Sequence, residues 1–173
     1  VPPRVDPDPR RQADAGELPG GEPGSGKSTA INILSTALSP DRGEIAFRGK
    51  KVGRQKDHFK RNLGIVPQDL AIYEEISAEK NVAFFASLYG LRGRELRQRV
   101  DEALAFVGLS ERKKDKPKTF SGGMKRRLNI ACAIAHGPQV LIMDEPTVGI
   151  DPQSRNHILE SIKQLGKTGT TII

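Results

Sequence analysis

The sequence predicts a single α/β domain in which an inserted lobe of helices interrupts a mostly parallel sheet. Its length of 173 residues corresponds to one domain. Short apolar segments that suit strands alternate with segments of helical periodicity, which is typical of a parallel α/β sheet. Between residues 77 and 135 helical segments follow one another directly, and this stretch predicts the inserted lobe.

The first twenty residues do not have the pattern of a folded segment. Residues 1–20 contain five of the twelve prolines and no apolar periodicity. Such a segment cannot bury enough surface to offset the entropy lost on ordering. It also lacks the apolar stretch of a secretory signal. We therefore expect residues 1–20 to be a disordered or non-native lead-in and residues 21–173 to be the folded domain.

The first half of this domain begins with a glycine-rich turn at residues 21–28. Apolar Ile31, Leu34 and Leu38 follow at helical spacing and predict a helix that continues until Pro40. Strands are expected at residues 44–48 and 63–66, the second of them ending before a proline. A polar loop with His58 is expected between them.

The second half begins with the predicted lobe. Ser77 can cap a helix that Gly90 ends. Two more helices are expected at residues 96–107 and 122–135, and the continuous apolar run 140–143 is typical of a buried parallel strand. Asp151 and Pro152 are an N-cap and a first-turn proline, so a helix should run from there to Gly166. Residues 170–173 complete the pattern as a strand.

The basic charge is concentrated in one segment. The chain has 28 Lys and Arg against 21 Asp and Glu, a net charge of +7. Residues 91–127 contain twelve basic and five acidic side chains and hold the whole excess. This segment is either a solvated face of helix and loop or a surface for nucleic acid or anionic lipid. Its basic block at residues 112–118 has no interleaved aromatic residues, which argues against base stacking.

Two other features exclude classes of protein. No stretch approaches the roughly 18 apolar residues that a membrane-spanning helix needs. The single cysteine, Cys132, cannot form an internal disulfide, which fits a reducing compartment. Its apolar neighbours predict that it is a small buried side chain.

A phosphate-binding motif occupies the glycine-rich turn. Residues 21–28 read Gly-Glu-Pro-Gly-Ser-Gly-Lys-Ser and match the pattern G-x-x-x-x-G-K-[ST]. Glycines let backbone N–H groups turn toward phosphate oxygens. Lys27 should contact the β and γ phosphates and Ser28 should bind Mg²⁺. An ordinary glycine-rich turn is the alternative, but a chance match is about one in a hundred for this length. The expected nucleotide-binding residues here are Gly21, Gly24, Ser25, Gly26, Lys27, Ser28 and Thr29.

Two carboxylates follow the apolar strand at residues 140–143. In open α/β sheets ligands bind where strands end, so Asp144 and Glu145 should lie at the site. Asp144 is expected to coordinate or orient Mg²⁺. Glu145 is expected to be the base that polarises the attacking water, pointing differently from Asp144 because of the strand pleat. A pair of solvated carboxylates is the alternative, and the phosphate-binding motif upstream favours the catalytic interpretation.

Further motifs resemble those of the ATP-binding cassette (ABC) ATPases, a family of P-loop NTPases. Phe120-Ser121-Gly122-Gly123-Met124-Lys125 resembles their signature motif, and it also reads as a serine N-cap, which is compatible. Gln68 resembles the Q-loop glutamine, and residues 148–151 resemble the D-loop with Asp151. Residues 170–173 resemble the strand that leads to the switch histidine. The resemblance covers residues 21–173.

The resemblance implies ATP and Mg²⁺ as ligands and a head-to-tail dimer with a second ATP-binding subunit. Lys27, Ser28, Gln68, Asp144 and Glu145 would serve one site, with Gln68 both a catalytic residue and a Mg²⁺ ligand. Ser121, Gly122, Gly123 and Asp151 would serve the partner's site. A membrane-spanning permease would dock on the 77–135 lobe, which places the chain in the cytoplasm, peripheral on the inner face of the membrane. Residues 87–92 and 121–127 are similar to subunits of drug, antibiotic and lipid exporters.

The sequence also departs from this family. Residues 13–20 are polar where an apolar strand is expected, and no aromatic residue precedes Phe47. Pro23 replaces an asparagine, Met124 replaces a glutamine, and the sequence reaches Ile173 without the switch histidine. We therefore expect a domain truncated at both ends, with weak ATP binding and little turnover by these residues alone. The alternatives are an inactive fragment and a soluble ABC-type ATPase acting on ribosomes or DNA, but nucleic acid is not an expected partner.

Overall fold

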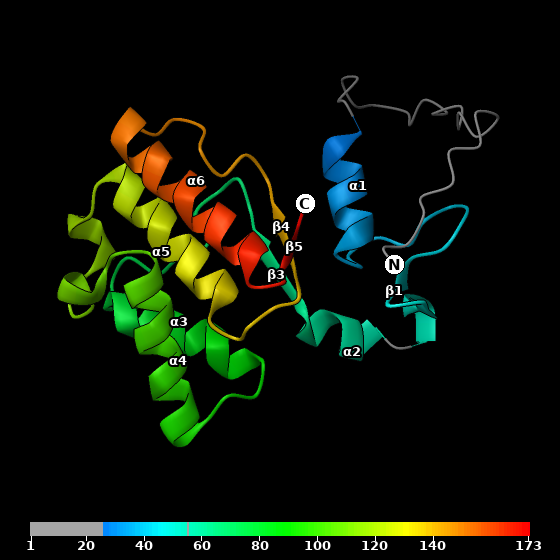
Figure 1. Cartoon of the computed structure of the whole chain (residues 1–173), viewed down its shortest axis with the longest axis horizontal. Helices are drawn as coiled ribbons and strands as arrows, with labels where there is room; N and C mark the ends of the chain where they lie inside the picture. The colour runs from blue at the N-terminus through cyan, green and yellow to red at the C-terminus, as the bar shows by residue number, and fades with distance from the viewer. Residues whose placement is uncertain (1–25, 55) are drawn as a thin grey trace.

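The computed structural model describes residues 26–54 and 56–173 (Figure 1). The lead-in predicted at residues 1–20 and residues 21–25 of the glycine-rich motif lie outside the described residues. The helices are α1 (Lys27–Leu34), α2 (Lys56–Arg61), α3 (Ala78–Leu88), α4 (Gly93–Phe106), α5 (Gly122–Ile134) and α6 (Pro152–Lys167). The strands are β1 (Ala46–Phe47), β2 (Lys50–Lys51), β3 (Leu63–Val66), β4 (Val140–Met143) and β5 (Thr171–Ile172).

A parallel sheet lies at the centre of the fold, as predicted. Its strands follow the order β3-β4-β5, and both neighbouring pairs are parallel. In the register of the first pair Leu63 lies opposite Val140 and Val66 lies opposite Met143. β3 and β4 therefore end level with each other, and the residues that follow them leave the sheet at the same edge.

The two faces of this sheet pack against different layers of helices. On β4, Leu141 is fully buried in the larger apolar cluster, which contains residues of α3, α4, α5 and α6. Its neighbour Ile142 is 1% exposed and belongs to a second cluster, into which α1 and α2 pack. Figure 1 shows α1 on one side of the sheet and α5 with α6 on the other. Alternation along the strand thus assigns the two helical layers to opposite faces.

The inserted helical lobe consists of α3, α4 and α5, which follow one another without a strand. Ser77 caps α3 as predicted, its hydroxyl accepting a hydrogen bond from the N–H of Lys80 at 3.4 Å. Gly90 follows the helix with a φ of 93°, a conformation that glycine adopts without strain. Buried Cys132 lies in the same core as predicted, and burial raises the pKa of its thiol to about 12.

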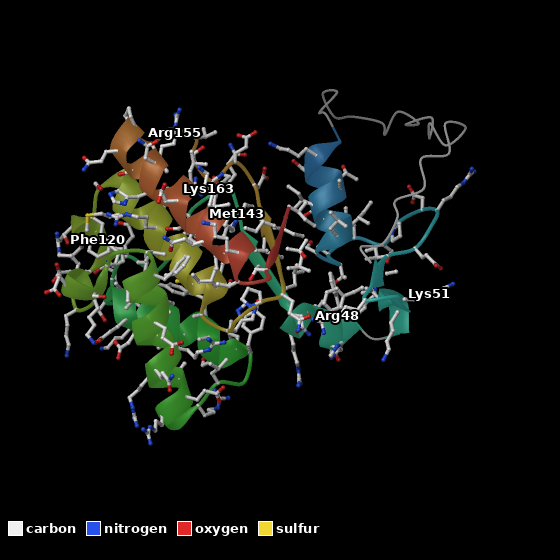
Figure 2. The ribbon with its side chains drawn as sticks, in the orientation of Figure 1. Arg48, Lys51, Phe120, Met143, Arg155 and Lys163 are labelled. Carbon is white, nitrogen blue, oxygen red and sulfur yellow. The ribbon has the colours of Figure 1, made fainter. Side chains whose placement is uncertain are left out.

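The segment between α1 and β3 differs from our prediction. α1 ends at Leu34 because Thr36 adopts a left-handed backbone with a φ of 63°, and Leu38 is 51% exposed. The strand expected at residues 44–48 is shorter and forms an antiparallel hairpin of β1 with β2. Arg48 and Lys51 are exposed on this hairpin (Figure 2).

α2 was not predicted, and His58, which we placed in a loop, lies on this helix. Its helical pattern is hard to see because Phe59 is its only buried residue. At the end of the chain α6 continues through Gly166 to Lys167, past the glycine that we expected to end it. Among the described residues, no helix combines the length and apolar character that crossing a bilayer requires.

A partly buried histidine joins the helical lobe to the sheet. The His136 ring, just after α5, stacks on Tyr89 with centroids 3.5 Å apart and planes 7° apart. His136 Nε2 and the Tyr89 hydroxyl lie 3.2 and 3.3 Å from the same carbonyl oxygen, that of Leu63 on β3. Burial, with a smaller contribution from the charge of Arg99, lowers the pKa of His136 from 6.5 to about 4.

This histidine should make stability depend on pH between about 4 and 6.5. In that window the unfolded chain binds a proton that folded His136 does not, so acid favours unfolding and stability rises with pH. The loss from pH 6.5 to 4 is at most about 3 kcal/mol, because one pKa unit corresponds to about 1.4 kcal/mol. His136→Phe keeps a ring on Tyr89 but cannot titrate, so its melting temperature should fall less on acidification. Circular dichroism melts would contradict this if both proteins lost equal stability.

Candidate functional site

The part of the phosphate-binding motif that the structure describes begins α1. Gly26 is the N-cap residue, and its φ of 71° lies in the left-handed region that glycine adopts readily. Lys27 is the first residue of the helix, and Ser28 and Thr29 complete an exposed first turn. Gly26 has no side chain with which to cap this helix end, and no side-chain cap comes from the described residues. The backbone N–H groups of the first turn are therefore available to an anion.

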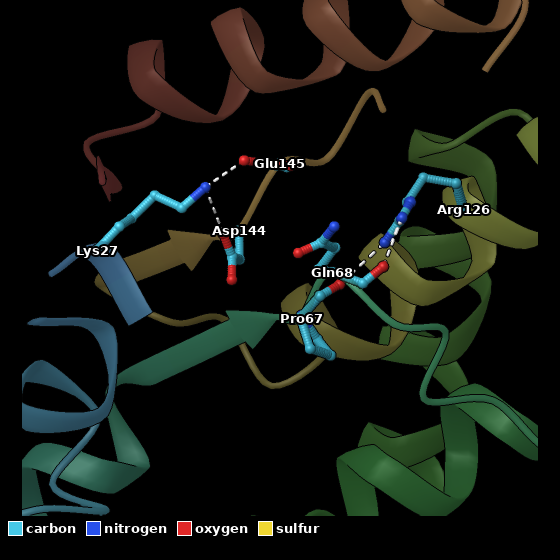
Figure 3. A network of polar contacts seen from close by, with 6 residues as sticks. All are labelled: Lys27, Pro67, Gln68, Arg126, Asp144 and Glu145. Atoms are coloured by element: carbon cyan, nitrogen blue, oxygen red, sulfur yellow. Dashed lines mark hydrogen bonds and ion pairs between the residues drawn. The ribbon is translucent and has the colours of Figure 1, made fainter. Parts of the chain in front are cut away.

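Lys27 meets the two carboxylates that follow β4 (Figure 3). Its ammonium donates a hydrogen bond to Glu145 Oε1 and lies 3.2 Å from Asp144 Oδ1. The bond to Glu145, together with the nearby Asp144, raises the pKa of Lys27. One lysine and two acids that are far apart in the sequence thus form one charged cluster where β4 ends.

The backbone explains why both carboxylates reach the same lysine. The Asp144 N–H donates to the Val66 carbonyl at 2.9 Å, which keeps this residue at the edge of the sheet. Glu145 then turns away from the strand with a φ of 47°, a left-handed conformation that non-glycine residues seldom adopt. We expected the strand pleat to point the two carboxyls in different directions. This was wrong, because β4 ends at Met143 and neither acid belongs to the strand.

Asp144 has an oxygen that is suited to a cation. Its side chain is 18% exposed, against 41% for Glu145. Asp144 Oδ1 is buried, and its partner among the described residues is the ammonium of Lys27, 3.2 Å away. Hard cations such as Mg²⁺ prefer oxygen ligands of this kind. No cluster of three or more His, Cys, Asp or Glu able to hold a metal occurs in the described part of the chain.

Gln68 lies beside this cluster. It is exposed and follows β3, which ends level with β4. Figure 3 shows its side chain extending from the end of β3 toward Asp144. The parallel register therefore places the predicted Q-loop glutamine and the predicted Mg²⁺ ligand at the same edge of the sheet.

The predicted signature residues lie at the start of α5. The Ser121 hydroxyl accepts a hydrogen bond from the Met124 N–H at 3.2 Å and caps the helix, as expected. Asp151 caps α6 because its carboxylate accepts a hydrogen bond from the Ser154 N–H at 2.9 Å. Hydrogen bonding to Ser154 lowers the pKa of Asp151. Gly123 is buried so closely against α6 that a Cβ there would overlap the Ser154 side chain. The N-terminal ends of α5 and α6 thus form one surface.

This surface is separate from the Lys27 cluster. Figure 1 shows the start of α5 and the start of α1 on opposite sides of the sheet. No hydrogen bond or ion pair joins Lys27 to residues 121–123 or to Asp151 within the described ranges. The structure therefore divides the predicted site residues into two groups that do not meet within one chain.

Two buried polar residues on α5 were missed in the sequence. Arg126 is 7% exposed and donates to the carbonyl oxygens of Pro67 and Gln68 at 2.9 and 2.7 Å (Figure 3). Asn129 is 3% exposed, and its Oδ1 accepts from the Ala71 N–H at 3.2 Å. The available signal was their spacing of three residues on an otherwise apolar helix face, which indicates polar groups with buried partners.

Comparison with known proteins agrees with these motifs. The family model described as ABC transporter matches residues 19–148. The chain is 52% identical to the linearmycin resistance ATP-binding protein LnrL of Bacillus subtilis (strain 168) over 153 residues, 88% of this chain and 49% of that protein. It is 37% identical to the daunorubicin resistance ATP-binding protein DrrA3 of Streptomyces coeruleorubidus, covering 88% of this chain and 48% of that protein. It thus spans about half the length of the curated relatives that it matches.

Solved structures show the same fold. The structure of cbiO1 from Clostridium perfringens, part of the ABC transporter complex cbiONQ, aligns with a TM-score of 0.78 at 33% identity, covering 88% of this chain and 63% of that one. The dimeric ATP-binding cassette MJ0796 in a post-hydrolysis state with ADP and Pi aligns with a TM-score of 0.72 at 27% identity, covering 85% and 68%. Together with the parallel sheet, these similarities confirm the predicted fold class.

The contact between α5 and α6 gives a matched pair of variants. Gly123→Ala places a methyl group against the Ser154 side chain, and overpacking of this kind costs about 1–3 kcal/mol. Gly122→Ala is the control, because nothing lies within 4 Å of the Cβ that it adds. Denaturant unfolding should show a lower free energy of unfolding for Gly123→Ala and no change for Gly122→Ala. Ser154→Gly should restore part of the lost stability, and equal stability of both alanine variants would contradict the packing.

Proposed function

Because the chain belongs to the ABC transporter family, we propose that it is an ATP-binding and ATP-hydrolysing subunit that energises export by a membrane-spanning partner. The observation that carries this proposal is the meeting of Lys27 with Asp144 and Glu145 at the carboxyl edge of the parallel sheet. Ligands of open α/β sheets bind at this edge. The matched relatives named for drug resistance support export as the direction of transport.

We assign ATP binding to the first turn of α1 and to the motif residues that precede it in the sequence. The ammonium of Lys27, which pairs with Glu145 and Asp144 in this structure, would exchange these carboxylates for the β and γ phosphates when ATP binds. Gly21, Gly24, Ser25, Gly26 and Thr29 complete the proposed nucleotide-binding residues. Mg²⁺, when bound, neutralises part of the phosphate charge. We propose that Ser28, Gln68 and Asp144 hold it, a role that fits the buried carboxylate oxygen Asp144 Oδ1.

Hydrolysis then depends on Glu145 and Gln68. We propose that the Glu145 carboxylate accepts a proton from water while the water oxygen forms a bond to the γ phosphorus. The bond from that phosphorus to the bridging oxygen breaks, and ADP and phosphate leave. Lys27 stabilises the charge that develops on the phosphate oxygens. Gln68 orients the water and the γ phosphate from the end of β3.

Ser121, Gly122, Gly123 and Asp151 need a second subunit to contribute to this reaction. The starts of α5 and α6, which carry these residues, lie across the sheet from the start of α1 (Figure 1), so one chain does not bring both groups to the same nucleotide. We propose a head-to-tail dimer in which the capped start of α5 contacts the ATP bound to the partner subunit. The similarity to a dimeric cassette structure supports this arrangement.

The membrane-spanning partner is proposed to dock on an aromatic patch of the helical lobe. Tyr73, Phe84 and Leu88 are 52%, 41% and 66% exposed. The Tyr73 ring lies 5.3 Å from that of Phe84, at an interplanar angle of 89°. Apolar side chains gathered on a surface mark an interaction site more often than scattered ones do. A chain docked here would lie in the cytoplasm against the inner face of the membrane.

A nucleic-acid partner is not favoured by the structure. Basic residues of segment 91–127 pair with carboxylates of the same chain, some of which lie outside that segment. The pairs are Arg99–Glu102, Arg112–Asp115, Lys113–Asp101, Lys118–Glu75 and Lys125–Glu74. Glu74 and Glu75 lie outside the segment and offset two of its seven excess charges, because the acids of the other three pairs are already counted in the net charge. These pairs support the solvated-surface interpretation.

Substitution of the proposed base tests hydrolysis directly. Glu145→Gln should lower the kcat for Mg²⁺-dependent ATP hydrolysis by about 100-fold or more, because the amide cannot accept the proton. Binding of labelled ATP should be retained, whereas Lys27→Ala should weaken it. Glu44→Gln is the control, because Glu44 pairs with exposed Lys51 on the hairpin. The assay uses the protein purified from its own host with the subunits that accompany it. Unchanged phosphate release by Glu145→Gln would contradict the proposal.

A surface variant tests docking. Leu88→Glu should leave stability within about 0.5 kcal/mol, as surface substitutions usually do, and should leave ATP binding unchanged. It should release the protein from the host membrane fraction, because the new charge opposes burial of the aromatic patch. The matched control is Leu159→Glu on α6, where the leucine is 42% exposed. If both variants sediment with membranes as the unchanged protein does, docking lies elsewhere.

A further inference from the structure

The backbone that follows β3 is held by α5. Arg126 donates to the carbonyl oxygens of Pro67 and Gln68, and Asn129 accepts from the N–H of Ala71. Residues three apart on a helix lie on the same face, so the two side chains act together on one segment. The course of residues 67–71 is therefore set by α5 as well as by the end of the strand.

The buried guanidinium of Arg126 is explained better by the geometry it imposes than by stability. Arg126 is 7% exposed, and an apolar side chain of similar volume often serves stability as well as a buried charge does. The guanidinium adds a fixed geometry, because its planar group of N–H donors binds two acceptors in defined positions. Here the acceptors are consecutive carbonyls on either side of the Gln68 Cα. Holding both of them restricts the rotation of the backbone that carries the Gln68 side chain.

We propose that Arg126 is a positioning residue for ATP hydrolysis, which aims Gln68 toward Asp144 and ties it to the helix that begins at Ser121. This inference rests on the proposed function, since it concerns the same ATP site. Ser121 and Arg126 lie on one rigid element, α5 with its N-cap. A displacement of the Ser121 end by the partner's ATP is therefore transmitted to Gln68 in the chain's own site. Arg126 thus couples the two sites of the dimer.

The matched control for this role is the neighbouring arginine. Arg127 also donates to two carbonyl oxygens, those of Val107 and Gly108 at 2.9 and 3.3 Å, but these lie after α4, away from Gln68. Arg126→Met should lower kcat by about 10- to 100-fold with little change in the KM for ATP, as expected when a catalytic group is misplaced. Arg127→Met should change kcat by less than about threefold even if it lowers the melting temperature as much. Arg126→Lys keeps a donor and should recover part of the activity.

A double-mutant cycle with Gln68→Ala tests whether Arg126 acts through Gln68. Arg126→Met should cause no further loss of kcat in the Gln68→Ala protein, because residues that act as a unit are not additive. Multiplicative losses, or equal losses of kcat in the Arg126 and Arg127 variants, would overturn the inference. If Arg126→Met does not fold, Arg126→Lys is measured in the same cycle.

The reference for these assays is the unchanged protein, purified from its own host with the subunits that accompany it. If that protein does not hydrolyse ATP, the proposed function fails and this inference fails with it. If it is active and the Arg126 variants keep its kcat, the inference alone is overturned.

Discussion

The parallel pairing of β3 with β4 is the constraint on which the rest of the site depends. In this register Val66 lies opposite Met143, so Gln68 and Asp144 emerge at the same edge of the sheet. The N–H of Asp144 donates to the carbonyl of Val66 and keeps the two strand ends together. A shift of one residue would exchange the side chains that face the two apolar clusters, so both clusters would have to repack.

The helices extend this constraint in two directions. α1 packs on one face of the sheet and carries Lys27 to the two carboxylates, while α5 packs on the other face and holds the segment after β3 through Arg126. The same α5 starts at Ser121, on the surface that we propose contacts a second subunit. The sheet edge is therefore linked mechanically to both the phosphate-binding helix and the proposed dimer surface.

Much of the fold could be predicted from local patterns. The apolar run of β4, the caps at Ser77 and Ser121 and the glycine after α3 each determine their element through nearby residues. α2 could not be predicted, because its contact with the core rests on Phe59 alone. The direction of the Glu145 side chain could not be predicted, because it depends on the left-handed backbone of Glu145 itself. Such a backbone is usually recognised in a sequence by a glycine, and this position has none.

The site was predicted as separate motifs, and the contacts between them came only from tertiary structure. Lys27 and Glu145 were each expected to serve one triphosphate, but nothing local to either residue indicates that they touch. The role of Arg126 was missed for a similar reason, because its partners are backbone carbonyls, which are present at every position of the sequence. Hydrogen bonds from a side chain to the main chain are therefore hard to predict from the amino-acid types of their partners.

A crystal structure of the protein with Mg²⁺ and a non-hydrolysable ATP analogue would test the central claim most directly. The account predicts that the ammonium of Lys27 leaves Glu145 and contacts the β and γ phosphate oxygens, with Asp144 facing the metal and Glu145 facing the γ phosphate. A nucleotide bound elsewhere, with the Lys27–Glu145 pair intact, would contradict it.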